Sequence, residues 1–158
     1  MSRGKARLAN DTWEALLRAH ATLMKEFAAE DIWTEVSMRE YDVLYTLSKC
    51  RGPIRLEKLH RHVLLSQPAL SRMVERLVNR GLVHRAPDPE DGRSVLLSLT
   101  EAGREQQRRV GRRHARSVAS AVTRRLTADQ LAQLKELCAL LAGTPAGPAD
   151  VRNQEDRS

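Results

Sequence analysis

Arginine and a few neutral polar side chains are the residues of this 158-residue chain with the clearest potential for chemistry. Arginine outnumbers lysine among the 27 basic residues, and its guanidinium binds phosphate or the edge of guanine through paired hydrogen bonds. Gln67 could match the edge of adenine in the same way, and Arg72 follows it closely. The net charge of +7 favours a polyanionic partner, although a GC-rich genome would produce the same excess of arginine.

Catalytic chemistry has no comparable support in the sequence. GxSxG, Gly-rich phosphate-loop and HExxH motifs are all missing, and no residues arrange a nucleophile with a base. The acidic residues Asp88, Glu90 and Asp91 are interrupted by proline, which is typical of a solvated turn, and the histidines are scattered. We therefore expect a protein that is not an enzyme and has no metal and no cofactor.

The two cysteines, Cys50 and Cys138, are far apart and lie outside any CxxC. This spacing argues against a disulfide framework and against a zinc knuckle. Cys138 falls within an apolar helical pattern and is expected in the core, whereas Cys50 lies at a helix end and could be more exposed. A redox role for Cys50 stays open as an alternative.

Aromatic and apolar residues exclude two further classes of protein. All five aromatic residues lie within the first 45 positions, so the basic second half lacks stacking platforms for single-stranded nucleic acid. No apolar stretch approaches the about 20 residues that span a bilayer, and the N-terminus lacks the apolar region of a secretory signal. We expect a cytoplasmic protein with no membrane partner.

Four helices are predicted before any strand. Apolar residues recur at helical spacing from Asn10 or Asp11 to about residue 31, and a capping box of Ser37 and Glu40 opens a helix that ends at Lys49. A short helix over about 56–63, a tight connection, and a helix from 66 to 81 follow. Two short helices joined by a brief turn form a helix-turn-helix unit.

A β-hairpin and two further helices complete the prediction. Residues 82–85 and 95–99 read as strands around an Asp-Gly turn, which makes a wing. Thr100 opens a helix to about residue 125, and Thr127 caps a last helix to about 143. The apolar face of the first of these two helices is expected to carry Gly111, Ala115, Val118 and Val122.

The expected fold class is mainly α with a small β-hairpin, a winged helix-turn-helix with N- and C-terminal dimerisation helices. We divide the chain into an N-terminal arm and dimerisation helix (1–36), a winged helix-turn-helix DNA-binding module (37–100), C-terminal dimerisation helices (101–143) and a disordered tail (144–158). The long amphipathic helices cannot bury both sides in a chain of this size. We expect them to pack against a second copy of the chain.

Three segments, in this order and at these spacings, resemble the MarR family of bacterial transcription regulators over about residues 10–142. Residues 64–85 resemble the family's recognition helix and first wing strand. Asp91-Gly92-Arg93-Ser94 resembles its D-x-R wing tip, and Leu99-Thr100-Glu101-Ala102-Gly103 resembles the L-T-x-x-G that opens its fifth helix. The resemblance implies a homodimeric winged helix with interleaved terminal helices.

The resemblance also implies which residues contact double-stranded DNA. The first turns of the recognition helix would face base edges in the major groove, and they present Ser66, Gln67, Ala69, Ser71 and Arg72. The alternative is that Ser66 only caps the helix and that Arg72 is solvated.

Further DNA contacts are expected from the same resemblance. Arg76 would meet phosphate, and Arg93 would enter the minor groove, steadied by Asp91. The alternative for this second pair is a plain surface salt bridge. Arg104 and Arg108 would lie near the DNA, and the later arginines of the fifth helix would form intersubunit salt bridges or face solvent.

Many members of the family bind small aromatic molecules between the dimerisation helices and the winged helix. Trp13, Asp42 and Arg85 match residues of urate-responsive relatives, whereas Met73 stands where those relatives have arginine. Together with Tyr45, these three matching residues predict a site for a small aromatic or anionic effector; packing is the alternative role for the aromatic residues. Peroxide-sensing relatives carry a cysteine near the start of the first helix, and this chain has none there.

These inferences predict a sequence-specific regulator of transcription, a repressor that binds a pseudo-palindromic operator as a homodimer and is released by the effector. Two alternatives stay open. One is an architectural protein that binds DNA without sequence preference through its positive charge, and the other is a redox-responsive regulator that uses Cys50.

Overall fold

The computed structural model describes residues 3–143 and contains, within that range, six helices and one antiparallel sheet. The predicted tail at 144–158 lies outside the described residues. The elements in chain order are α1 (Arg3–Ala28), α2 (Met38–Lys49), β1 (Ile54–Arg55), α3 (Leu56–His60), α4 (Gln67–Asn79), β2 (Val83–Pro87), β3 (Val95–Leu99), α5 (Glu101–Thr123) and α6 (Ala128–Leu141).

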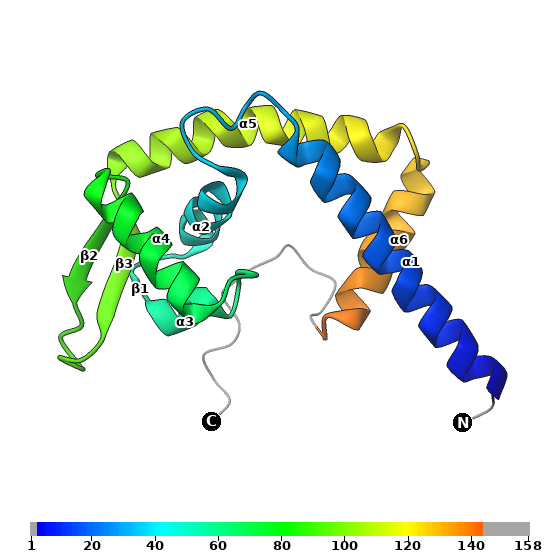
Figure 1. Cartoon of the computed structure of the whole chain (residues 1–158), viewed down its shortest axis with the longest axis horizontal. Helices are drawn as coiled ribbons and strands as arrows, with labels where there is room; N and C mark the ends of the chain where they lie inside the picture. The colour runs from blue at the N-terminus through cyan, green and yellow to red at the C-terminus, as the bar shows by residue number, and fades with distance from the viewer. Residues whose placement is uncertain (1–2, 144–158) are drawn as a thin grey trace.

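The elements form an arch (Figure 1). Helices α2, α3 and α4 and the sheet make one end, α1 and α6 make the other, and α5 runs along the top between them. The mainly helical winged helix-turn-helix predicted from the sequence is confirmed. None of the helices within residues 3–143 has the length and apolar character needed to cross a membrane.

One hydrophobic core lies within the winged helix-turn-helix. Leu44 of α2, Leu59 of α3, Leu70 and Leu77 of α4, and Leu97 of β3 are fully buried there. These five side chains come from three helices and one strand. Their shared burial therefore fixes the position of α4 relative to the sheet.

Side-chain caps set the helix starts that the sequence predicted. Ser37 and Glu40 form the capping box of α2, and Thr127 forms another with Gln130 at α6. Thr100 accepts a hydrogen bond from the N–H of Gly103 at 3.0 Å and donates one to the carbonyl of Gly81 at 2.6 Å. This residue therefore joins the start of α5 to the end of the α4 segment.

The first helix and the sheet differ most from the prediction. Helix α1 begins at Arg3 rather than near residue 11, because residues 3–10 contain no proline, and Arg7 and Asp11 form an ion pair at 3.8 Å along it. The sheet gains a third strand, β1, which pairs Ile54 with Leu97 in the order β1-β3-β2. A two-residue strand is too short to give a periodic pattern in the sequence.

Helices α5 and α6 differ from the prediction in which side chains they bury. Cys138, expected in the core, is exposed, and α6 has no buried residue. On α5 the buried residues are Gly103, Gln106, Val110 and Ala121, whereas the predicted stripe residue Ala115 is exposed. Within residues 3–143, the chain therefore leaves the leucines Leu134, Leu137, Leu140 and Leu141 of α6 exposed.

Aromatic rings fill the junction of α1, α2 and α5. Phe27, Trp33 and Tyr41 surround His114 with ring centroids 5.2–5.6 Å from its imidazole. The indole of Trp33 also donates a hydrogen bond to the carbonyl of Phe27 at 2.6 Å, which satisfies a carbonyl at the end of α1.

Candidate nucleic-acid interface

Helix α4 presents a continuous polar surface opposite its buried side. Ser66 caps the helix by accepting the N–H of Ala69 at 3.4 Å, and Pro68 lies in the first turn. Leu70, Met73, Val74 and Leu77 are buried. Ser66, Gln67, Ser71, Arg72 and Arg76 are exposed and Ala69 is half-buried, so six of the predicted DNA residues share one helix.

The far end of α4 is tied to the start of α2. Glu40, which is buried, accepts a hydrogen bond from Nη1 of Arg80 at 3.3 Å, and its carboxylate lies 3.9 Å from Nε of Arg76. Arg80 also donates to the carbonyl of Glu35. These contacts were not predicted, because Glu40 and Arg80 are 40 residues apart in the sequence.

Asp91 organises the loop that presents Arg93. Its carboxylate accepts the hydroxyl of Ser94 at 2.7 Å and the backbone N–H of Arg93 at 3.1 Å, and these hydrogen bonds lower the pKa of Asp91. Among residues 3–143, Asp91 forms no ion pair with the guanidinium of Arg93. Asp91 thus holds the backbone of the wing tip, while the Arg93 side chain is exposed.

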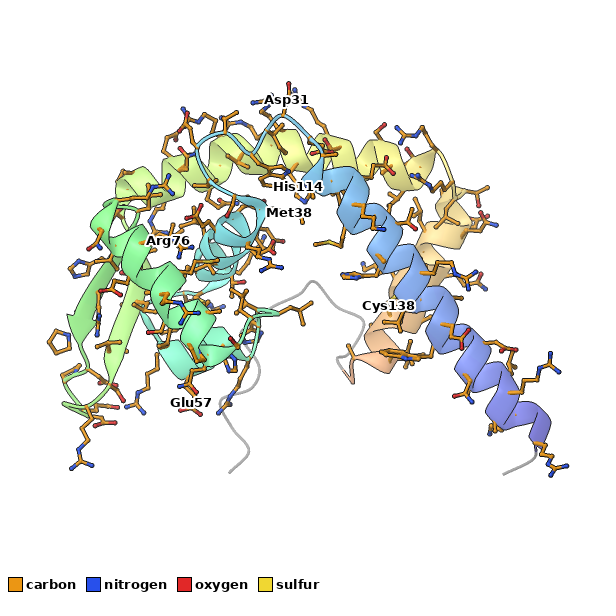
Figure 2. All side chains as sticks on the ribbon, in the orientation of Figure 1. Asp31, Met38, Glu57, Arg76, His114 and Cys138 are labelled. Atoms are coloured by element: carbon orange, nitrogen blue, oxygen red, sulfur yellow. The ribbon has the colours of Figure 1, made fainter. Side chains whose placement is uncertain are left out.

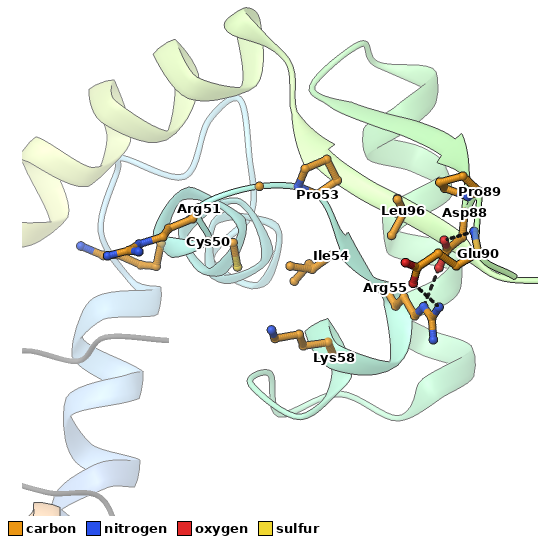
Figure 3. Close-up of a pocket in the computed structure, with 12 residues that line it drawn as sticks. Cys50, Arg51, Pro53, Ile54, Arg55, Lys58, Asp88, Pro89, Glu90 and Leu96 are labelled. Atoms are coloured by element: carbon orange, nitrogen blue, oxygen red, sulfur yellow. Dashed lines mark hydrogen bonds and ion pairs between the residues drawn. The ribbon is translucent and has the colours of Figure 1, made fainter. Parts of the chain in front are cut away.

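The base of the wing is fixed to β1 by a buried aspartate (Figure 3). Asp88 is 5% exposed, and its Oδ2 lies 2.6 Å from Nε of Arg55. The N–H of Glu90 donates to Oδ1 at 2.9 Å, and this bond, followed by the one from Arg55, lowers the pKa of Asp88. The prediction that the acidic residues form only a solvated turn is wrong for Asp88, because β1 supplies a cation to bury against it.

Two predicted effector residues, Asp42 and Tyr45, line a cavity of about 920 Å³ between the end of α1, the start of α2 and the loop after α3. Loss of hydration beside the surrounding side chains raises the pKa of Asp42, although the charge of His114 opposes this shift. Trp13 lies on an exposed face of α1 and Arg85 on β2, and neither lines the cavity. Trp33, another of the clustered aromatic residues, also lines the cavity, and the lining that sequence reasoning missed includes Met24, Lys25, Arg39 and His62.

Cys50 is half-buried beside a second cavity, of about 720 Å³ (Figure 3). Its thiol donates to the carbonyl of Thr46 at 3.3 Å, and burial raises its pKa, although Lys58 opposes the shift. A raised pKa leaves less of the reactive thiolate. No three His, Cys, Asp or Glu side chains gather as metal ligands anywhere in residues 3–143.

The arginines of α5 form ion pairs within the chain. Arg108 pairs with Glu101 and Glu105, and Arg104 is exposed. Four of the later arginines are exposed, as one of the two expected roles requires, and they also form ion pairs that were not predicted. Their partners lie in α1 and the following loop: Arg109 with Glu35, Arg113 with Asp31, and Arg124 and Arg125 with Glu26.

Comparisons with known proteins agree with this geometry. The model of the MarR family matches residues 36–95. The multiple antibiotic resistance protein MarR of Salmonella typhimurium is 31% identical over 103 residues, which cover 65% of this chain and 71% of that protein.

Two solved structures resemble most of the chain. A mutant of MarR from E. coli complexed with operator DNA has a TM-score of 0.67 and 26% identity, and covers 80% of this chain and 93% of that one. The PcaV transcriptional regulator from Streptomyces coelicolor, in complex with its natural ligand, has a TM-score of 0.63 and 31% identity, with coverages of 84% and 89%. The chain therefore belongs to the MarR family of winged-helix transcription regulators.

Proposed function

We propose that the chain is a repressor that binds a specific, pseudo-palindromic duplex as a homodimer and is released by a small aromatic or anionic effector. The observation that carries this proposal is the exposed polar surface of α4, which includes Arg72 and Arg76. The opposite side of the helix is apolar and buried, and it holds this surface in place. A capped helix of this length fits the major groove, where Gln67 would read adenine and Arg72 guanine.

The wing supplies the second contact of the proposed reading surface. Asp88 anchors the base of the loop and Asp91 its tip, so the exposed Arg93 projects from a rigid support. A guanidinium in that position suits a narrow minor groove. The operator complex of the E. coli relative supports a target of this kind.

Uncovered apolar side chains support the homodimer. Helix α6 exposes Leu134, Leu137, Leu140 and Leu141, and α1 exposes Leu8, Trp13 and Leu17. Large apolar patches of this kind mark interaction sites in proteins that are otherwise polar. A two-fold dimer covers the same patch on both copies and matches the symmetry of a pseudo-palindrome.

The 920 Å³ cavity supports an effector. It lies where α1 meets the winged helix-turn-helix, so an occupant would press on both. Its lining combines the aromatic rings of Trp33 and Tyr45 with the cationic side chains of Lys25 and Arg39, a mixture that suits an aromatic acid. The structure of the relative PcaV in complex with its natural ligand also supports a site of this kind.

The test is selection of duplexes from a random-sequence library by the purified protein, followed by footprinting at about 150 mM salt. We expect a two-fold symmetric protected stretch with half-site centres about 10 base pairs apart, bound at least ~10³-fold more tightly than random DNA. Arg72→Ala should cost ~1–3 kcal/mol and relax one base preference, whereas Arg116→Ala, an exposed arginine of α5, should not relax any. Failure to enrich any sequence would favour the architectural alternative.

A further inference from the structure

Glu40 is a buried carboxylate that connects the recognition helix α4 to the loop at the rim of the effector cavity. It is 8% exposed, and its two oxygens have different partners. Oε2 accepts the N–H of Ser37, which lines the cavity, at 2.8 Å. Oε1 accepts Nη1 of Arg80 at 3.3 Å and lies 3.9 Å from Nε of Arg76.

The two arginines use this carboxylate differently. Arg80 donates one hydrogen bond to it and a second to the carbonyl of Glu35. Both bonds are made within the chain, so the role of Arg80 is to join α4 to the start of α2. Arg76 approaches through Nε at a distance beyond hydrogen bonding, and its side chain is 57% exposed (Figure 2). Glu40 therefore lies close enough to attract the Arg76 guanidinium, which stays open to solvent.

We propose that Glu40 is a positioning residue, which holds the Arg76 guanidinium in the orientation that binds the DNA backbone. The inference rests on the proposed DNA-binding function. A free arginine side chain loses rotational freedom when it binds a phosphate, and a side chain already oriented loses less. A buried carboxylate is costly to keep unless it is paired, and here its Oε1 faces two arginines of the α4 segment.

Glu40→Gln separates this role from simple electrostatics by the sign of its effect. The glutamine keeps an oxygen for the N–H of Ser37 and suits the capping box. Its amide nitrogen cannot accept the hydrogen bond of Arg80, and it lacks the charge that attracts Arg76, so the double variant with Arg76→Ala isolates the second loss. Removing a negative charge near DNA strengthens binding by Coulomb attraction alone. If Glu40 positions Arg76, the same change weakens binding instead.

The experiment measures affinity for a random-sequence duplex of about 20 base pairs, as a function of salt, for the wild type, Glu40→Gln, Arg76→Ala and the double variant. We expect Glu40→Gln to weaken binding about threefold and Arg76→Ala to weaken it more and reduce the salt slope by about 1. In the Arg76→Ala background, Glu40→Gln should not weaken binding further. Glu75→Gln removes an exposed charge from the same helix and should strengthen binding.

Each outcome decides the inference. Equal weakening by Glu40→Gln with and without Arg76 would mean that Glu40 only supports the fold, and melting curves of all variants provide the check. Stronger binding by Glu40→Gln would mean that Glu40 competes with the phosphate, and would overturn the inference. If Arg76→Ala leaves the salt slope unchanged, the inference fails because Arg76 does not touch the backbone. Sequence-specific binding is tested separately by the library selection. The proposed function and the inference about Glu40 can therefore fail independently.

Discussion

Gly103 occupies a position where no side chain fits. A Cβ built on it would lie 1.9 Å from the carbonyl oxygen of Leu82 and 2.9 Å from its carbonyl carbon. Both atoms belong to the backbone, so they cannot rotate away. We therefore predict that Gly103→Ala forces the start of α5 away from the turn between α4 and β2.

The size of the effect follows from the contacts that this displacement breaks. Ordinary contact of the new methyl requires a shift of about 1.5 Å, and over-packing of this kind costs ~1–3 kcal/mol. The shift would also weaken two hydrogen bonds of Thr100, to Leu82 at 3.2 Å and to Gly81 at 2.6 Å, each of which contributes about 1 kcal/mol. Alanine recovers less than about 1 kcal/mol through its helix propensity, so the expected net loss is about 3 kcal/mol.

Thermal unfolding followed by circular dichroism at equal protomer concentration measures this loss. A destabilisation of about 3 kcal/mol lowers Tm by roughly 6–12 °C in a chain of this length. The matched control is Gly52→Ala, since Gly52 has a negative φ and no atom lies within 4 Å of the place that the new methyl group would take. This control variant should be nearly neutral. Equal melting temperatures for the two variants would refute the steric argument.

Three further predictions concern the wing and the dimer. Arg93→Ala should weaken operator binding, most where the wing meets A·T-rich DNA. Unchanged affinity at low salt would show that Arg93 does not contact DNA. Leu140→Asp, at a leucine that is 76% exposed in one chain, should convert the dimer to monomers in sedimentation velocity, and a dimer that persists would place the interface elsewhere. The lowered pKa of Asp88 means that its contribution to stability is present at neutral pH and is lost as pH falls below about 4. Urea unfolding should therefore show a steeper loss of stability on acidification for the wild type than for Asp88→Asn, and parallel profiles would contradict this.

Local signals account for the parts of the fold that the sequence predicts well. Ser37, Ser66, Thr100 and Thr127 each accept a hydrogen bond from an N–H three residues later, so each helix start depends on neighbouring residues. The wing likewise follows from its own turn residues, since Asp91 bonds to Arg93 and Ser94. Patterns of this range are readable without knowledge of the tertiary structure.

Contacts between distant parts of the chain are what the sequence does not reveal. Arg55 and Asp88 are 33 residues apart, and no spacing rule connects them. Cys138 shows a different limit: its helical pattern is apolar, but no side chain within residues 3–143 buries it. Periodicity identifies a face that needs covering and does not say which molecule covers it.

The junction at Thr100 and Gly103 has a mechanical consequence. Because the turn before β2 contacts the first residues of α5 directly, we expect the winged helix-turn-helix and α5 to move together as one rigid unit. A helix of 23 residues is about 34 Å long, so a tilt of about 5° at one end displaces the other by about 3 Å. Half-sites one helical turn apart leave little tolerance for such a displacement. A rotation too small to disturb the packing of either end would then be enough to take the two reading helices of the proposed dimer out of register with DNA.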